Sequence, residues 1–342
     1  MPGLARALAL AAGVMAAPVS RAQVLDFADL RGWQADDHQA ALQTFVATCD
    51  LVEGAEWGPL CALAPQATGS AASARAFFEL FFRPVVVGSA PALFTGYYEP
   101  ELTGSTSRTP RFAYPIYRMP PELSPGSVWY SREEIETRGL LRGRGLEIAW
   151  LEDPVEVYFL MVQGSGRIRL QDGSMIRVGY AGKNNQPYKS IGQELVRRGT
   201  HSMADVSARE IRSWVRANPA AGAALMNENP SFVFFREIGN LPADRGPIGA
   251  MTRSLTAMRS VAVDPAYVPL GAPVWIEKDG PAPLNRLMVA QDTGGAITGE
   301  QRADIFFGTG FDAGEAAGQI KDGGRMVILL PIERAYALLP EG

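Results

Sequence analysis

The chain has 342 residues, of which 47% are hydrophobic and 20% are charged, and its formal net charge is −4. This composition is typical of a folded globular protein and excludes an intrinsically disordered chain or a fibre. At roughly 100–200 residues per domain, the length predicts two domains, or one domain with a large insertion. The acidic balance, without a dense cluster of lysine and arginine, excludes a general nucleic-acid-binding protein, because neutralising phosphates requires a basic surface.

The N-terminal residues have the pattern of a secretory signal peptide. Arg6 precedes an apolar stretch over residues 7–17, and Ser20 and Ala22 supply small residues at the two positions that a signal peptidase reads. We therefore predict a signal peptide over residues 1–22 and export of the rest of the chain. The apolar stretch is shorter than the roughly 20 residues that a transmembrane helix needs. An alanine-rich first helix is the alternative interpretation.

The only cysteines of the chain are Cys49 and Cys61. In an oxidising compartment, an even and closely spaced pair usually forms a disulfide, and we expect that bond here. In the chain-entropy model it would stabilise the fold by about 3 kcal/mol. Two reduced, buried cysteines are the alternative. Neither cysteine has the neighbours of a catalytic thiol or a metal site, and a histidine-based triad is not expected because His38 and His201 stand alone.

The region after the predicted signal peptide is expected to be helical. Apolar residues recur at i, i+3, i+4 and i+7 from Leu42 to Cys49, which is typical of one face of a helix. Ser73 is a candidate N-cap for a second helix, which carries four phenylalanines within residues 77–82.

From Phe94 onward, the sequence takes on β character. Residues 155–162 form a long apolar run, and residues 167–170 and 175–178 flank Asp172-Gly173, a β-hairpin signal. We expect antiparallel sheet from these segments. Two capping-box patterns then predict two or three short helices within residues 190–229.

Six short apolar or β-branched runs follow, separated by turns rich in glycine, proline and aspartate. They cover residues 231–237, 260–263, 272–277, 286–290, 305–307 and 326–330. Their even spacing favours a barrel or a sandwich over a parallel α/β sheet. Residues 108–125 and 239–249 are the predicted crossings between two lobes.

Three aspartates stand at the ends of predicted strands. Asp292 ends one strand, Asp304 begins the next, and Asp264 ends a third. If the strands pair around the loop of residues 294–299, Asp292 and Asp304 lie at the same end of the barrel. A carboxyl held there against apolar neighbours would have a raised pKa, which suits a general acid. From spacing alone, a turn or cap role for these aspartates remains open.

Two other motifs predict different chemistry and are weaker. Asp292-Thr293-Gly294 after an apolar strand is the tripeptide that houses the catalytic aspartate of aspartic proteases. Those enzymes need two carboxylates that share a proton, so a single copy demands a symmetric dimer, and this chain is far longer than the dimeric versions. Gly164-Ser165-Gly166 lacks the third glycine and the opening helix of a dinucleotide site, and it is predicted to be a turn.

Five motifs stand in order along most of the chain. They are Phe94-Thr-Gly-Tyr-Tyr-Glu-Pro100, Val162-Gln-Gly-Ser-Gly166, Tyr188-Lys-Ser-Ile-Gly192, Arg259-Ser-Val-Ala-Val-Asp264 within the segment 255–270, and Gln291-Asp-Thr-Gly-Gly295 with Arg302-Ala-Asp304. Together they resemble the membrane-bound lytic murein transglycosylase A family. The last part looks like the module named for three aspartates, matched here by Asp264, Asp292 and Asp304.

This resemblance implies a mainly β fold with some α structure. We expect a six-stranded double-psi β-barrel with N-terminal helices, built from residues 23–110 and 238–342, around an inserted smaller β domain of residues 111–237. A sugar-binding groove would lie between the two. The catalytic acid of the family maps onto Asp304, and a supporting carboxylate maps onto Asp292. No cofactor and no metal are implied.

The resemblance also implies an activity, cleavage of the β-1,4 bond between N-acetylmuramic acid and N-acetylglucosamine of peptidoglycan with formation of a 1,6-anhydro ring. The expected substrate-binding residues are Thr95, Tyr97, Tyr98, Gln163, Lys183, Tyr188, Ser190 and Asp264. A carbohydrate hydrolase on a similar barrel, with two carboxylates, and a non-catalytic peptidoglycan-binding protein are the alternatives.

The expected location and partners follow from the same resemblance and from the predicted signal peptide. We expect a monomer in the periplasm that binds peptidoglycan glycan strands. Association with other cell-wall enzymes stays open. Tethering to the outer membrane also stays open, because no cysteine that could carry a lipid follows the apolar stretch.

Overall fold

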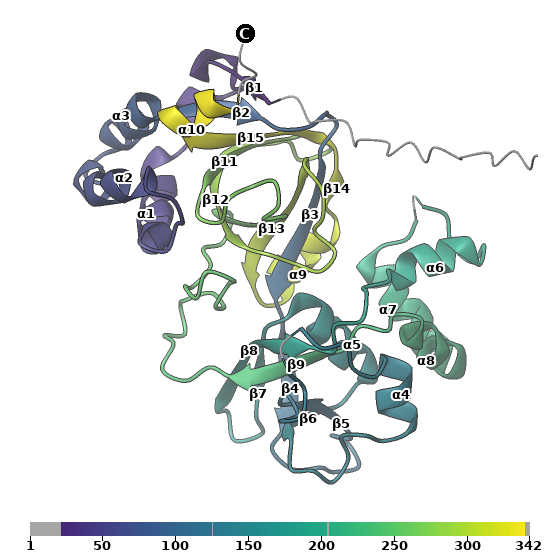
Figure 1. Cartoon of the computed structure of the whole chain (residues 1–342). Helices are drawn as coiled ribbons and strands as arrows, with labels where there is room; N and C mark the ends of the chain where they lie inside the picture. The colour runs from purple at the N-terminus through teal and green to yellow at the C-terminus, as the bar shows by residue number, and fades with distance from the viewer. Residues whose placement is uncertain (1–21, 125, 204, 339–342) are drawn as a thin grey trace, which may run out of the picture.

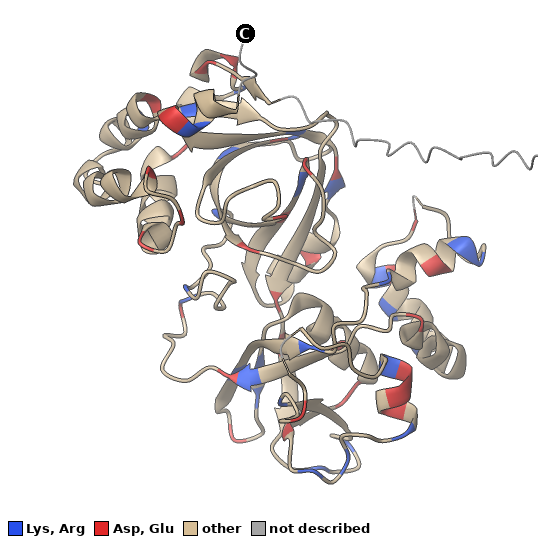
Figure 2. Ribbon diagram, viewed as in Figure 1, with Lys and Arg blue, Asp and Glu red and all other residues tan. Residues whose placement is uncertain are grey.

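The computed structural model describes residues 22–338 apart from residues 125 and 204; the predicted signal peptide, except Ala22, lies outside the described residues. The chain folds into two lobes joined by two crossings (Figure 1). The barrel lobe contains a nine-stranded sheet, and the second lobe contains a six-stranded sheet. Charged residues of both signs are spread over both lobes (Figure 2).

The sheet of the barrel lobe curls around its own core (Figure 1). Its strands, in spatial order, are β1 (Gln23–Val24), β2 (Phe82–Val86), β15 (Gly324–Pro331), β11 (Pro273–Lys278), β12 (Leu284–Asp292), β10 (Ser260–Val263), β13 (Arg302–Thr309), β3 (Leu93–Glu99) and β14 (Lys321–Asp322). Two pairs, β10 with β12 and β13 with β3, are parallel. Among the described residues, β1 and β14 remain as edges. The predicted class, mainly β with some α structure, an inserted domain and N-terminal helices, is confirmed; the sheet curls as a barrel does but is not closed in the described residues.

The N-terminal helices cover one side of this sheet. They are α1 (His38–Cys49), α2 (Trp57–Leu63) and α3 (Ala71–Phe81), with short 3-10 turns at Phe27–Asp29, Trp33–Ala35 and Ala64–Ala67; α9 (Phe311–Gly318) and α10 (Ile332–Ala337) complete the lobe. Buried aromatic rings of Phe45, Trp57 and Phe82 pack together between helices and sheet. A disulfide joins Cys49 at the end of α1 to Cys61 in α2, with Cα atoms 5.4 Å apart.

The second lobe has its own sheet and its own core. Its strands, in spatial order, are β5 (Tyr114–Tyr117), β6 (Glu147–Leu151), β4 (Glu101–Ser105), β7 (Gly166–Arg169), β8 (Met175–Lys183) and β9 (Val233–Glu237). Its helices are α4 (Arg132–Thr137), α5 (Pro154–Gln163), α6 (Ile191–Arg197), α7 (Ala208–Ala217) and α8 (Pro219–Asn227). The hairpin predicted around Asp172-Gly173 is β7 and β8, and three short helices lie within residues 190–229 as predicted.

Two predictions of local structure were wrong. The apolar run at residues 155–162 is helix α5, not a strand: the Asp153 side chain caps its first turn by accepting from the Val155 N–H, and Pro154 occupies the first helical position. Gly164 then ends the helix in the left-handed conformation, with φ of 78°. The N-cap of α3 is Ser70 and not the predicted Ser73: the Ser70 side chain accepts from the backbone N–H of Ser73.

Sheet membership also moves the first crossing between the lobes. Strand β4 already belongs to the second lobe, so the chain leaves the barrel lobe at Pro100, and not within residues 108–125. Residues 101–110, which we assigned to the barrel domain, therefore lie with the second sheet. The return crossing follows β9 and includes residues 239–249, as predicted.

Candidate active site

Asp304 lies in β13, where it is partly buried and is the register partner of Thr95 in β3. The Thr95 hydroxyl donates a hydrogen bond to Oδ1 of Asp304. Burial raises the pKa of Asp304 above its usual range, while the bond from Thr95 and the charge of Arg302 oppose that rise. A carboxyl with a raised pKa keeps its proton closer to neutral pH than an exposed one, which is what a general acid requires.

Asp292 is the last residue of β12 and is also partly buried. Its Oδ2 accepts a 2.9 Å hydrogen bond from the Tyr97 hydroxyl, and its Oδ1 accepts a 3.0 Å bond from the backbone N–H of Ala250. Burial is the main cause that raises the pKa of Asp292 to about 6; these hydrogen bonds oppose the rise, and the charge of Asp304 adds to it. Both oxygens of Asp292 are thus engaged by the protein itself.

Strand β10 places the two aspartates in one row. Ala262 is the register partner of Asp292 on one side and of Asp304 on the other. Neighbouring strands lie about 4.8 Å apart, so the Cα atoms of the two aspartates are separated by roughly 10 Å across the sheet. Asp292 and Asp304 therefore lie level with each other on the two strands that flank β10.

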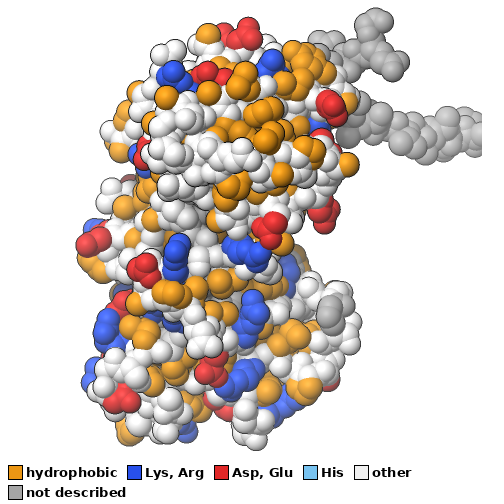
Figure 3. Space-filling model, turned by 90° about the vertical axis from the view of Figure 1, so that its left-hand side faces the viewer, with side chains coloured by type: hydrophobic (Ala, Val, Ile, Leu, Met, Phe, Trp, Pro, Cys, Tyr) orange, Lys and Arg blue, Asp and Glu red, His pale blue; other side chains and the backbone are white. Residues whose placement is uncertain are grey.

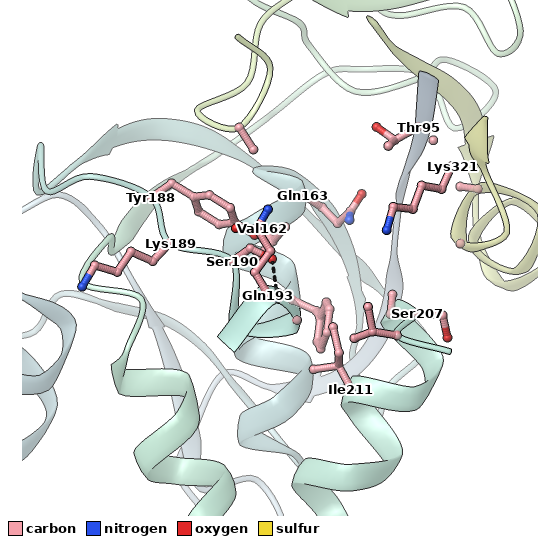
Figure 4. Close-up of a pocket in the computed structure, with 18 of the residues that line it drawn as sticks. Thr95, Val162, Gln163, Tyr188, Lys189, Ser190, Gln193, Ser207, Ile211 and Lys321 are labelled. Atoms are coloured by element: carbon pink, nitrogen blue, oxygen red, sulfur yellow. Dashed lines mark hydrogen bonds between the residues drawn. The ribbon is translucent and has the colours of Figure 1, made fainter. Parts of the chain in front are cut away.

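A cleft of about 790 Å³ lies between the two lobes beside this row. Among the residues that line it are Thr95, Tyr98 and Arg302 from the barrel lobe and Gln163, Tyr188 and Ser190 from the second lobe. Figure 4 shows Thr95 and Lys321 across the pocket from the second-lobe residues. Its charged side chains are mostly basic: Lys189, Arg197, Arg212, Arg302 and Lys321 against Glu194 and Glu228. This local positive charge suits an anionic ligand, although the whole chain is acidic.

Two residues of the second lobe approach the aspartate row. Tyr188 lines the cleft, and its phenol pKa is raised mainly by burial and to a smaller extent by the charge of Asp304. Lys183, at the end of β8, lies beside the loop that follows Asp292: a Cβ added at Gly295 would be 3.8 Å from its ammonium nitrogen. The second lobe thus contributes a hydroxyl and a cation at the end of the barrel lobe where Asp292 and Asp304 lie.

The other predicted binding residues have structural partners as well. Gln163 accepts a 3.0 Å hydrogen bond from the backbone N–H of Tyr98, and the Tyr98 hydroxyl accepts one of 3.3 Å from Arg212. Ser190 caps α6 by accepting from the backbone N–H of Gln193, as Figure 4 shows. Tyr97 is buried against Phe306, with ring centroids 5.3 Å apart, and its hydroxyl donates to Asp292.

Asp264 directly follows β10 and stands two residues after Ala262, the register partner of the other two aspartates. Its Oδ1 accepts a 3.0 Å bond from the Ala266 N–H and its Oδ2 a 2.8 Å bond from the Gly299 N–H; none of the three aspartates is among the residues that line the cleft. It holds the end of the loop that separates β12 from β13. Within the described residues, no group of three or more histidine, cysteine, aspartate or glutamate side chains could hold a metal ion.

Two charged residues near the site were missed by the sequence analysis. Arg302 lies two residues before Asp304, so strand alternation puts both side chains on one face, and this spacing was a usable signal. The Glu99 side chain, only 1% exposed, ends β3 and accepts bonds of 2.8 Å from Arg167 and 3.0 Å from Arg177 of the second lobe. Both arginines also donate to backbone carbonyls of residues 242–245 in the return crossing. This Glu99 cluster ties the two lobes together.

Comparison with protein families gives two matches. Residues 93–236 match the MltA-specific insert domain, and residues 259–330 match the 3D domain. The first match begins with β3 and covers the second lobe, and the second contains Asp264, Asp292 and Asp304 with strands β10 to β13.

Relatives and solved structures agree with these matches. The chain is 36% identical over 264 residues to membrane-bound lytic murein transglycosylase A of Vibrio cholerae, which covers 73% of this chain and 69% of that protein. For the Escherichia coli K12 protein of the same name, identity is 39% over 247 residues, covering 69% of this chain and 65% of that protein, just under two thirds. A membrane-bound lytic murein transglycosylase structure from Agrobacterium tumefaciens superposes with a TM-score of 0.81 at 33% identity, covering 93% of this chain and 99% of that one. E. coli MltA with bound chitohexaose superposes with a TM-score of 0.70 at 30% identity, covering 86% and 90%.

Proposed function

The chain belongs to the membrane-bound lytic murein transglycosylase A family of peptidoglycan lytic transglycosylases, and we propose that Asp304 is its single catalytic acid and base. The bond cleaved is the β-1,4 bond between N-acetylmuramic acid and N-acetylglucosamine. The observation that carries this assignment is the position of Asp304: a partly buried carboxyl with a raised pKa, beside the cleft between the lobes.

The first half of the reaction requires an acid. Protonated Asp304 donates its proton to the glycosidic oxygen while the bond from that oxygen to C1 of the muramic acid breaks. Burial of the Asp304 carboxyl favours the protonated form at the start of the cycle. The leaving N-acetylglucosamine then carries the proton as a free hydroxyl.

The second half closes a ring within the product. The 6-hydroxyl of the muramic acid attacks C1, and the now ionised Asp304 takes the proton of that hydroxyl, which regenerates the acid. Attack within one molecule has a high effective concentration, so no second carboxylate is needed to activate water. Asp292 supports this cycle from two strands away: its oxygens are occupied by Tyr97 and Ala250, so it acts on the site by its charge and by holding the strand ends.

The cleft residues provide the binding surface for the glycan. Tyr98 and Tyr188 offer aromatic rings, and Gln163, Ser190 and Lys183 offer polar groups, on walls that come from both lobes. The basic lining can meet the carboxylates of the lactyl groups and peptide stems. Figure 3 shows further basic side chains on the second lobe next to the junction, on the side of the molecule away from α6 and α7.

We propose that the protein is exported and works in the periplasm as a monomer on peptidoglycan strands. The relatives in the comparison are named membrane-bound. No helix of the described part of the chain is long and apolar enough to cross a bilayer. Attachment to the outer membrane and association with other cell-wall enzymes would be carried by features outside the site described here.

The mass of the products tests the proposed function. Purified sacculi are digested with the full chain in water enriched in heavy oxygen, and the released muropeptides are analysed by mass spectrometry. We expect anhydromuropeptides, lighter by one water than hydrolysis products and without heavy oxygen. Reducing-end muropeptides that carry the label would refute the proposal in favour of a hydrolase, and binding without release in favour of a non-catalytic protein.

A further inference from the structure

Arg302 is fixed beside the catalytic carboxyl by three acceptors. Its guanidinium donates a 2.8 Å bond to the Thr95 hydroxyl oxygen, a 2.6 Å bond to the Ala303 carbonyl and a 3.3 Å bond to the Leu93 carbonyl. These acceptors lie on β13 and on β3, the two parallel strands that carry Asp304 and Thr95. The guanidinium is thus held in place by the same ladder that positions the catalytic residue.

This contact decides the direction of the hydrogen bond between Thr95 and Asp304. A guanidinium can only donate, so the Thr95 oxygen must accept from Arg302. The single hydroxyl proton of Thr95 then has Oδ1 of Asp304 as its acceptor among the described residues. A proton on Oδ1 would leave the Thr95 hydroxyl without that acceptor, which carries the cost of an unmade bond.

The other oxygen of Asp304 has a different environment. Among the described residues, the bond from Thr95 to Oδ1 is the one hydrogen bond that the Asp304 carboxyl accepts, and Oδ2 is not among the buried side-chain atoms that lack a partner. Oδ2 of this partly buried carboxyl therefore keeps some contact with solvent, next to Thr95 and Arg302, which line the cleft. The two oxygens of the same side chain are thus chemically distinct.

We propose that Arg302 is a positioning residue that acts through Thr95: it keeps Oδ1 of Asp304 as a permanent acceptor and so assigns the catalytic proton to Oδ2. This inference rests on the proposed acid and base role of Asp304. The Oδ2 proton goes to the glycosidic oxygen as its bond to C1 breaks, and Oδ2 takes a proton back from the 6-hydroxyl as the new bond to C1 forms.

The charge of Arg302 has a second consequence for the cycle. It stabilises the ionised form of Asp304 and so opposes the rise in pKa that burial causes. Removing this charge raises the pKa of Asp304 further, so the fall of activity at alkaline pH moves to higher pH. The ionised form must also act as the base in the ring closure, so kcat falls at the same time.

The test compares Arg302→Gln, Thr95→Val and the double variant with the wild type, using soluble glycan strands and measuring kcat and KM against pH. We expect Arg302→Gln to lower kcat by about tenfold and to move the alkaline limb of the kcat–pH profile to higher pH. In the Thr95→Val background, the same change should lower kcat by less than about twofold, because the hydroxyl through which Arg302 acts on Asp304 is already absent. Arg302→Lys keeps a charged donor and should restore most of kcat and the position of the limb.

Lys321→Met is the matched control, because it removes a positive charge from the same cleft on a strand that also pairs with β3. It can change KM, but it should leave the alkaline limb in place. An unmoved limb in Arg302→Gln, or additive effects of the Arg302 and Thr95 variants on kcat, overturns the inference. If Arg302→Gln does not fold, Arg302→Lys decides: a kcat close to that of the wild type with an unmoved alkaline limb supports the inference, and a kcat as low as that of Thr95→Val overturns it. Anhydromuropeptides from the wild type in the same assay show that the proposed function stands independently of this outcome.

Discussion

The change Asp292→Asn tests the electrostatics of the site through stability. Burial raises the pKa of Asp292 from 3.8 to about 6, a shift of roughly two units. At 1.36 kcal/mol per unit, this corresponds to about 3 kcal/mol. The pKa of the folded state lies above that of the unfolded state, so the associated stability is fully present below about pH 4 and is lost as the pH rises through about 6.

Asparagine has no such dependence on pH. Its amide has the size of the carboxyl, can accept from the Ala250 N–H, and can donate to the Tyr97 hydroxyl, which is able to accept. Relative to the wild type, the variant should therefore gain stability as the pH rises. Of the full 3 kcal/mol, about 2 kcal/mol should appear between about pH 4.5 and pH 7.5.

Urea unfolding of both proteins at these two pH values measures the effect. Asp244→Asn provides the control, because Asp244 is exposed in the return crossing and the chemical change is the same; its effect should stay within about 0.5 kcal/mol at both values. Equal pH dependence of the unfolding free energy in Asp292→Asn and the wild type would refute the burial argument for this carboxyl.

Three further changes probe the junction, the cleft and the disulfide. Glu99→Gln should lower the unfolding free energy by about 3 kcal/mol, because it leaves two arginines without their buried carboxylate. The control Glu101→Gln breaks an exposed ion pair and should lower the unfolding free energy by less than about 1 kcal/mol, and similar losses in the two variants would contradict the role of the Glu99 cluster. Tyr98→Ala should weaken the binding of soluble peptidoglycan strands about tenfold in calorimetry, with the thermal midpoint changed by only a few degrees. A loss of stability with unchanged affinity would assign the Tyr98 ring to packing. Cys49→Ser should lower the unfolding free energy measured in urea by about 3 kcal/mol under oxidising conditions, and adding a reductant should lower it no further. If a reductant destabilised the variant and the wild type equally, the result would contradict the disulfide.

The features that the sequence predicted well depend on local signals. The hairpin at Asp172-Gly173 and the cap at Ser190 are defined by a few neighbouring residues. The apolar run at residues 155–162 was misassigned, because length and hydrophobicity do not separate a buried strand from a buried helix. The deciding signals were Asp153-Pro154 before it and Gly164 after it, which are a helix start and a helix end.

The composition of the site depends on contacts between distant segments. Thr95 and Asp304 are 209 residues apart, and only the parallel pairing of β3 with β13 brings them together. Strand-end positions were enough to place Asp292 beside Asp304 in the sheet, but not to predict that Asp264 accepts hydrogen bonds from Ala266 and Gly299. The spacing of Arg302 and Asp304 places both side chains on one face of β13, but the contact of Arg302 with Thr95 depends on the register of β13 against β3, which no local pattern shows.

The rate at which Asp304→Asn releases anhydromuropeptides from sacculi tests the central claim most directly. Asparagine keeps the size of the side chain but can neither donate an acidic proton nor take one back. We predict a loss of at least about a hundredfold in release, with the affinity for soluble peptidoglycan strands and the thermal midpoint close to those of the wild type. Release at the wild-type rate by a folded Asp304→Asn protein would contradict it and would move the acid and base to another residue.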